Sequence, residues 1–257
     1  MPFTLAHGAA ALPFRRFRLV TSGVLIGTFA PDFEYFLRLA PHGRFGHTLA
    51  GAILLTLPVA LVVLWLFHDF VKLPVARLLP DAIRSRLANH LHDFRFRGAA
   101  RFALIVGSVL LGIATHVFWD AFTHVNSWPC HHWAWLRQPI RVPVAGLYPF
   151  YAVLQHLSTV VGLGVLCLWL AHWYRSTEPS RQALDNPISS QRAITIWAIV
   201  MSGALVGATM RAILGSGIPI HSLAPKRFVA QFVITLIVIL WWELVAYGVF
   251  SSKAERC

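Results

Sequence analysis

Three ionisable residues recur at every fourth position inside an apolar stretch of the chain: His116, Asp120 and His124. On an α-helix, residues four apart lie on one face, so these three are predicted to form a ladder of two imidazoles and one carboxylate. Ionisable groups at membrane depth cost free energy, and those found there usually mark a ligand site or a proton path. The spacing therefore predicts that this helix contributes to a ligand site or a proton path, and not only to packing.

Further candidate donors precede the ladder in the chain. Pro31 is followed by Asp32 and Glu34, His47 comes fifteen residues after Asp32, and His7 lies near the start. Imidazole nitrogens and carboxylate oxygens are common ligands of zinc and also suit manganese and iron, and one carboxylate can bridge two ions. We therefore expect a divalent metal, zinc first, with manganese or iron as alternatives. The predicted metal ligands are His7, Asp32, His47, His116, Asp120 and His124.

The composition predicts an integral membrane protein. Of 257 residues, 57% are hydrophobic and only 12% are charged. The mean hydropathy of +0.63 excludes an ordinary soluble domain. Five apolar runs approach the roughly 20 residues that cross a bilayer as a helix, so we predict an all-α, polytopic transmembrane helical bundle. The runs are Thr48 to Val71, Ala99 to Phe122, Tyr148 to His172, Arg192 to Gly215 and Phe228 to Phe250.

A sixth apolar run, Leu19 to Ala30, is cut short by Pro31 and Asp32. Proline cannot continue a regular helix without losing a hydrogen bond, so this N-terminal segment is predicted to be a short tilted span or a re-entrant half-helix. A full crossing would put His7 and His47 on opposite sides of the membrane. We therefore expect the segment to be short and to leave these two histidines on one side.

The charge pattern predicts the orientation and the surroundings. The chain carries 22 Lys and Arg against 10 Asp and Glu. The basic excess between Lys72 and Arg101 predicts a cytoplasmic loop, which places Thr123 to Pro143 and the candidate site towards the outer face. No basic soluble segment is present to bind nucleic acid, so we expect anionic lipid headgroups as the counterpart of the positive charge.

The predicted organisation is one membrane domain covering residues 1–257. Residues 1–156 hold nearly all candidate site groups, whereas 192–250 form two helices that we interpret as scaffold. The oligomeric state leaves no signature in the sequence.

Several motifs resemble a known family of bacterial membrane proteins, domain of unknown function 4184. These motifs are Met1 to His7, Ala30 to Phe36, His47-Thr48, Thr115 to His124 and Leu154 to Ser158. The resemblance extends over most of the chain. It implies a multi-pass protein of a bacterial inner (cytoplasmic) membrane, and it assigns no activity.

A more distant resemblance concerns the order of histidines and aspartates. It is similar to the membrane-bound metal-dependent hydrolases related to LexA-binding inner-membrane proteins, and to zinc-dependent phospholipase C. There, an Asp and a His about fifteen residues apart, followed by His-x-x-x-Asp, hold zinc. The resemblance implies that Asp32, His47, His116 and Asp120 hold zinc, with His7 as an early and His124 as a later ligand. A further His-x-x-x-Glu pair of the phospholipase has no counterpart after His124.

These features predict a membrane-embedded, metal-dependent hydrolase of a phosphoester in a lipid or lipid-linked substrate. Glu34 is expected to orient or deprotonate water, and Arg44 to contact phosphate. One alternative is a transporter in which the same residues bind a metal or relay protons. Another is a non-catalytic membrane scaffold whose polar residues tie helices together.

Overall fold

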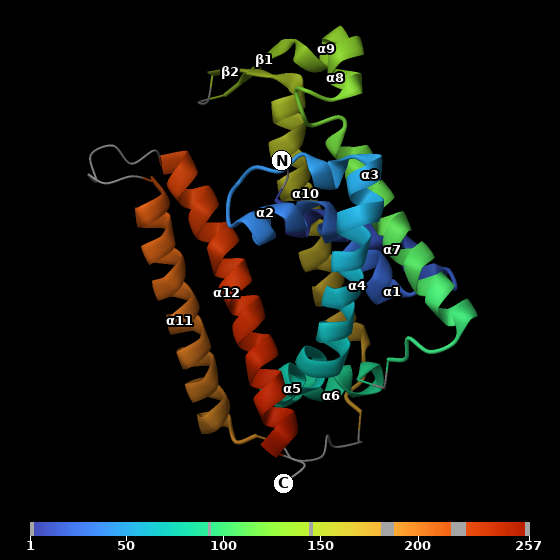
Figure 1. Cartoon of the computed structure of the whole chain (residues 1–257), viewed down its shortest axis with the longest axis vertical. Helices are drawn as coiled ribbons and strands as arrows, with labels where there is room; N and C mark the ends of the chain where they lie inside the picture. The colour runs from blue at the N-terminus through green and yellow to red at the C-terminus, as the bar shows by residue number, and fades with distance from the viewer. Residues whose placement is uncertain (1–2, 92–93, 144–145, 181–187, 217–224, 255–257) are drawn as a thin grey trace. The chain divides into compact units, whose positions relative to one another are not determined.

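The chain is almost entirely helical in the computed structural model, which describes residues 3–91, 94–143, 146–180, 188–216 and 225–254 (Figure 1). The only strands among these residues form one short hairpin between two long helices. Five helices of the described chain are long and apolar enough to cross a membrane. They cover Leu49–Arg77, Ala99–Asp120, Phe150–Ser176, Ser190–Gly215 and Arg227–Ser251. The predicted fold class, an all-α polytopic bundle with five spans, is confirmed.

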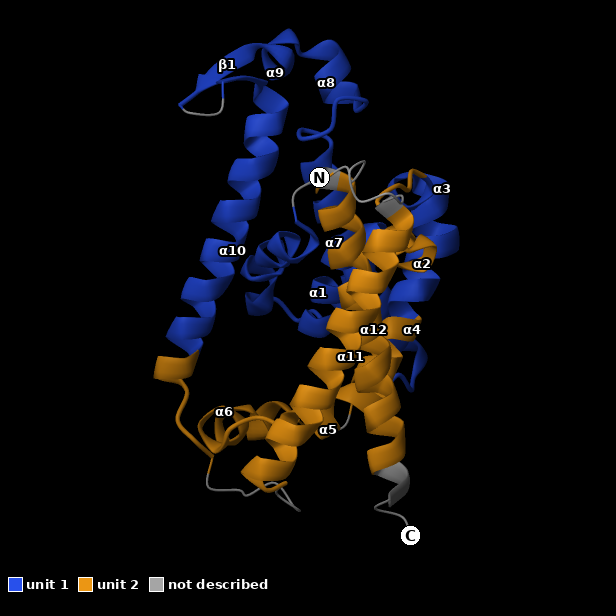
Figure 2. Ribbon diagram, turned by 90° about the vertical axis from the view of Figure 1, so that its left-hand side faces the viewer, with its two compact units in different colours: residues 1–32, 45–61, 96–173 blue, residues 33–44, 62–95, 174–257 orange. Residues whose placement is uncertain are grey.

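The chain packs as two compact units, which Figure 2 distinguishes by colour. Unit 1 comprises residues 1–32, 45–61 and 96–173, and unit 2 comprises residues 33–44, 62–95 and 174–257. The elements of unit 1 are η1 (Thr4–Ala11), η2 (Pro13–Arg16), α1 (Thr21–Phe29), η3 (Ala30–Asp32), η4 (Phe45–His47), α3 (Leu49–Gly51), η5 (Ala52–Thr56), α7 (Ala99–Asp120), α8 (Trp128–His132), α9 (Ala134–Arg137), β1 (Pro139–Val142), β2 (Gly146–Pro149) and most of α10 (Phe150–Ser176). Those of unit 2 are α2 (Phe33–Arg38), η6 (Phe67–Val71), α5 (Lys72–Arg77), α6 (Asp81–Leu87), η7 (Ala88–His90), α11 (Ser190–Ser216) and α12 (Pro225–Ala254), while α4 (Leu57–Leu66) begins in unit 1 and ends in unit 2.

The sixth apolar run folds as the short helix α1. With 9 residues it is about 13 Å long at 1.5 Å per residue, far less than the roughly 30 Å of a bilayer core. Pro31 ends the regular helix, and the chain passes through the 3₁₀ turn η3 into α2. As predicted, this segment is short and broken at Pro31.

Two glycines bring α1 and α7 into close contact (Figure 1). A Cβ atom on Gly27 would overlap the carbonyl oxygen of Val109, and one on Gly112 would overlap that of Val24. Small residues at a crossing let two helix backbones approach, which is the usual basis of helix association in membranes. The backbone of α1 therefore lies directly against α7, one turn before His116.

Prolines shape the first long span, which runs without a break from α3 to α5. The π-helical segments η5 and η6 come just before Pro58 and Pro74. A proline has no N–H to donate, so the carbonyl four residues earlier is released and the helix widens there. Phe70 is the residue four positions before Pro74, and its carbonyl oxygen lies against Gly248 of α12, where a Cβ atom would overlap it. Glycine is required at that contact.

The loop after α7 is rich in exposed aromatic residues. Helices α8 and α9 carry Trp128 and Trp135, with Trp133 between them, and all three are largely exposed. Strands β1 and β2 pair in antiparallel register, with Ile140 opposite Tyr148. Tryptophan and tyrosine are typical of the boundary between hydrocarbon and water, so this segment suits the membrane surface at the ends of α7 and α10.

Candidate metal centre

Helix α7 positions two of the predicted ligands. His116 and Asp120 are four residues apart and both are buried, with exposed fractions of 0% and 4%. The helix ends at Asp120, so His124 lies beyond it, in the turn that follows. The predicted ladder therefore has two positions on the helix and not three. His124 Nδ1 lies 2.9 Å from the Asp120 carbonyl oxygen, which also accepts from the Thr123 amide at 3.1 Å.

The N-terminal element η1 positions His7. It is a 3₁₀-helix of eight residues, and in such a helix residues three apart lie directly above one another. Thr4 and His7 therefore share a face, and both reach the same cluster. The Thr4 hydroxyl donates to Asp32 Oδ2 at 2.6 Å, while His7 lies beside Asp120.

Two short 3₁₀ turns carry the remaining donors. Asp32 is the last residue of η3 and is fully buried, with an exposed fraction of 0%. His47 is the last residue of η4, which is held against the following helix because the Thr56 hydroxyl donates to the Gly46 carbonyl oxygen at 3.2 Å. The side chains of both turns reach α7, Asp32 at His116 and His47 at Asp120.

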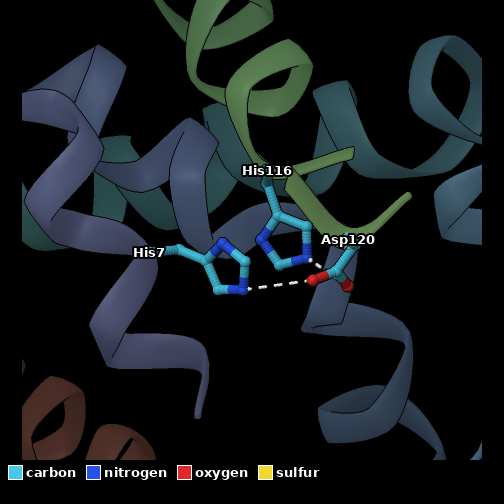
Figure 3. A group of neighbouring side chains, drawn as sticks. All are labelled: His7, His116 and Asp120. Atoms are coloured by element: carbon cyan, nitrogen blue, oxygen red, sulfur yellow. Dashed lines mark ion pairs between the residues drawn. The ribbon is translucent and has the colours of Figure 1, made fainter. Parts of the chain in front are cut away.

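The donor atoms of these elements meet at one place in unit 1. His47 Nε2 lies 3.6 Å from Asp32 Oδ1 and 3.5 Å from Asp120 Oδ2. His116 Nε2 lies 3.6 Å from Asp32 Oδ1 and 3.3 Å from Asp120 Oδ2. His7 Nε2 lies 3.4 Å from Asp120 Oδ1. Figure 3 shows the imidazoles of His7 and His116 stacked side by side, each with a nitrogen directed at Asp120.

Two overlapping groups of donors have the spacing of a metal site. One is His7, His116 and Asp120, and the other is Asp32, His47 and His116; within each group the donor atoms lie within 4.8 Å of one another. His116 belongs to both groups. The donors of the two groups thus come from four segments far apart in sequence, η1, η3, η4 and α7.

Hydrogen bonds behind the cluster orient its donors. His116 Nδ1 lies 2.7 Å from the carbonyl oxygen of Thr28, so the ring donates there and turns the lone pair of Nε2 towards the cluster. The bond from Thr4 occupies Asp32 Oδ2 and leaves Oδ1 facing His47. Metal-bound histidines and carboxylates in proteins are held by the same kind of outer contact.

Several donor atoms of the cluster are buried without a hydrogen-bond partner among the described residues. They are His7 Nε2, Asp32 Oδ1, His116 Nε2 and both carboxylate oxygens of Asp120. A buried polar atom that lacks a partner costs about 1–3 kcal/mol, and several in one place are rare in a native protein. A cation that accepts lone pairs from all of them would remove this cost, so the donor set fits a metal ion.

His47 and His124, which lie just outside the spans, differ in protonation. Burial lowers the pKa of His47, but the carboxylates of Asp120 and Asp32 outweigh burial and raise the pKa from 6.5 to about 9. The pKa of His124 is lowered by burial, which the Asp120 carboxylate offsets only in part. Without a metal, His47 is therefore charged at neutral pH and balances one carboxylate, whereas the His124 ring is neutral.

Comparison with protein families identifies the family of the chain. Residues 1–249 match the family described as domain of unknown function DUF4184. The chain belongs to this family. The match covers every motif on which the first resemblance rested and all six predicted ligands of the DUF4184 chain. Comparisons with curated proteins and with solved structures found no match.

The structure of this DUF4184 chain brings five of the six predicted ligands into the two donor groups, and places His124 at their edge. The His124 side chain is 35% exposed, and its Nδ1 lies 3.7 Å from Asp120 Oδ2. Glu34 and Arg44 belong to unit 2. Glu34 is buried and accepts a hydrogen bond from Arg38 Nε at 2.9 Å, and Arg44 is an exposed loop residue.

Sequence reasoning missed the two groups that orient the cluster. The Thr4 hydroxyl has a detectable signal, because a polar residue three positions before His7 shares its face if the segment is a 3₁₀-helix. The Thr28 carbonyl has none, since every residue carries a carbonyl group. Only the crossing of α1 and α7 determines which carbonyl faces His116.

Proposed function

We propose that this protein is a membrane-embedded, metal-dependent hydrolase that cleaves a phosphoester in a lipid or lipid-linked substrate. The observation that carries the proposal is the convergence of buried imidazole nitrogens and carboxylate oxygens from four segments on one place. Such a set is costly inside a membrane protein unless it binds a ligand that accepts its lone pairs.

The donor types favour zinc as the ion. Imidazole nitrogens and carboxylate oxygens are its usual ligands where no thiolate is present. Four distances of 3.3 to 3.6 Å link Asp32 Oδ1, His47 Nε2, His116 Nε2 and Asp120 Oδ2. Donors this close could converge on one ion, and manganese and iron, which accept the same donors, are the alternatives.

Both oxygens of Asp120 would be available to hold metal. Its Oδ2 faces His47 and His116, whereas its Oδ1 faces His7. If two ions bind, His7 and Asp120 would help to hold the second. Paired ions of this kind, when bound, polarise a phosphoryl oxygen and activate water.

The residues of the chain hold and orient these groups. His116, fixed by the Thr28 carbonyl, and Asp32, fixed by the Thr4 hydroxyl, keep their donors in place during the reaction. Hydrolysis adds the hydroxyl of one water molecule to phosphorus, and the alcohol oxygen that leaves takes the remaining proton. Glu34 as the group that orients water and Arg44 as a phosphate contact remain part of the hypothesis.

The setting supports a lipid substrate. The cluster lies at the ends of two membrane spans, Leu49–Arg77 and Ala99–Asp120, next to the hydrocarbon. The basic segment between these spans favours a cytoplasmic loop, which would place the cluster towards the outer face of a bacterial inner membrane. A phosphoester of a membrane lipid would then be within reach of the cluster.

Metal content and turnover test this function. The protein purified in mild detergent should contain zinc by elemental analysis, and it should hydrolyse phospholipid phosphoesters in vesicles without any ion gradient. Metal uptake into sealed proteoliposomes without hydrolysis would identify a transporter instead. The absence of metal from the protein after incubation with zinc, manganese or iron would contradict both functions and leave a scaffold. The His172→Gln protein, altered at an exposed position of α10, is the control for the purification.

A further inference from the structure

A cavity of about 760 Å³ lies in unit 1 between η1, α7 and α10. Its volume is within the range of small-molecule sites, about 300–1,000 Å³. Alanines of η1 form one wall, Phe118 of α7 a second, and Leu157 and Val161 of α10 a third. His7 also lines it, so the cavity and the metal cluster share a residue.

The walls of the cavity offer a ligand almost no polar atoms. Thr115 and Ser158 line it, but their hydroxyls donate to backbone carbonyls of their own helices, to Gly112 at 2.7 Å and Leu154 at 2.6 Å. The indole of Trp119 and the imidazole of His7 are the other polar groups of the lining. The cavity is thus almost entirely apolar and meets the cluster at His7, which suits a lipid: a hydrocarbon chain joined to a phosphate.

Several side chains that line the cavity are also exposed on the surface of the spans. Phe118 is 66% exposed, and Leu157 and Val161 are each 53% exposed, although all three line the cavity and lie on spans. Inside a bilayer, such surfaces contact lipid chains, because water is excluded there. An apolar cavity at this depth would be open to lipid and not to water.

A hydrogen bond and a glycine contact hold α10 against η1, and so apart from α7. The Phe3 amide donates to Thr159 Oγ1 at 3.0 Å, and Gly162 packs against the backbone of Ala6. Along the rest of its length α10 has little buried surface. Element η1 therefore acts as a spacer between the two spans, and the space beside it remains open from Leu154 to Val161, about 12 Å of helix.

We propose that this cavity binds one acyl chain of a glycerophospholipid and so delivers the phosphoester of that lipid to the cluster. The inference rests on the proposed hydrolase function and names its substrate class. Because the opening extends along two turns of α10, the second acyl chain can stay in the bilayer while the first enters. His7, which belongs to both the lining and the cluster, would then lie near the phosphate of the bound lipid.

Photolabelling of the full chain in lipid nanodiscs tests this. The probe is a glycerophospholipid with a diazirine in the middle of one acyl chain, and labelled positions are mapped by peptide mass spectrometry. Labels should concentrate at Leu157, Val161 and Phe118. Leu168, on the same helix and 73% exposed but outside the cavity, is the internal reference. Labelling of Leu168 equal to or above that of Leu157 would overturn the proposal.

A larger side chain that fills the cavity should exclude the lipid. Ala114 of α7 lines the cavity, and in the Ala114→Phe protein labelling at Leu157 and Val161 should fall about tenfold, because a filled site cannot admit a chain. The matched control is Ala171→Phe, the same change at an exposed position of α10, which should label like the wild type. Unchanged labelling in an Ala114→Phe protein that purifies with its metal would contradict the inference.

Two further measurements separate this inference from the proposed function. The Asp120→Asn protein should lose its metal and still be labelled in the cavity, because Asp120 is not part of the apolar wall. Labelling of a protein that never binds metal would refute the hydrolase function and retain the lipid site. A metal-loaded protein labelled only by a prenyl phosphate probe would refute the acyl-chain assignment alone.

Discussion

Polar side chains are buried in both units, and their arrangement differs. In unit 1 the donors come from η1, η3, η4 and α7, and they point at one another. In unit 2, the buried Gln231 and Thr235 and the half-buried Glu243 follow one another along α12. Gln231 and Glu243 lie against Gly215 and Gly203 of α11, where a Cβ atom would overlap them.

The two sets of polar side chains differ in whether their atoms converge on one point. They do not differ in having atoms without partners, because such atoms occur in both units. Gln231 Oε1, Thr235 Oγ1 and Glu243 Oε2 also lack hydrogen-bond partners among the described residues. Yet the groups with metal-site spacing found in the described chain all lie in unit 1. In unit 2, glycines of one helix make room for large polar side chains of the next, which lets the two helices pack closely. In unit 1, donors from four segments are oriented by further hydrogen bonds, which is the arrangement of a ligand site.

The largest expected difference between the two units appears when one carboxylate of each is replaced by its amide. Asp120→Asn removes the charge whose two oxygens face His7, His47 and His116. Bound metal should fall below about a tenth of the wild-type content, and any hydrolysis should disappear, while the protein still inserts in the membrane. Elemental analysis of the purified protein measures this.

The matched control is Glu243→Gln in α12, which should keep full metal content. A protein with Asp120→Asn that retains its metal and activity would show that convergence in unit 1 is structural. Loss of metal from Glu243→Gln would remove the contrast between the two units.

The second effect is a pH dependence of metal binding. His47 must lose its proton to bind a metal, so the affinity should rise about tenfold per pH unit until the pH reaches its pKa of about 9. The metal-free protein should behave in the opposite way. Protonated His47 stabilises it fully below pH 6.5, and this contribution is lost as the pH rises from 6.5 to about 9. Metal titration and thermal unfolding across this range measure both slopes; parallel slopes would contradict the assignment.

The third effect concerns the outer contact of Asp32. Thr4→Val keeps the shape of the side chain and removes the hydroxyl that donates to Asp32 Oδ2. Metal affinity should fall about 10- to 100-fold, as is usual when an orienting group is lost. Competition with a chelator measures the affinity. Thr195→Val, at an exposed position of α11, should leave it unchanged; equal affinities in all three proteins would assign Thr4 no orienting role.

The smallest effect comes from the helix crossing that orients His116. Gly112→Ala places a methyl group against the Val24 carbonyl and should lower the free energy of unfolding by about 1–3 kcal/mol. Gly107→Ala, on the same helix with open space around it, should be neutral or stabilising by up to about 1 kcal/mol. Unfolding in detergent measures both. A neutral Gly112→Ala would show that α1 and α7 have room to separate.

Several features followed from the sequence alone because they depend on local properties. The five spans follow from the length of apolar runs, and the break of the first apolar segment follows from Pro31, which lacks an N–H. The shared face of His116 and Asp120 follows from helical periodicity. Membership of the DUF4184 family likewise followed from short motifs that lie along the chain.

Other features were decided only by the tertiary structure. The end of α7 at Asp120 removed His124 from the helix, although the spacing predicted a ladder of three. The Thr28 carbonyl meets His116 because Gly27 and Gly112 let α1 approach α7. A backbone carbonyl has no sequence signature, and an encounter between helices depends on how side chains far apart in sequence pack together. The cavity beside His7 arises in the same way, from the spacing of α7 and α10 by η1.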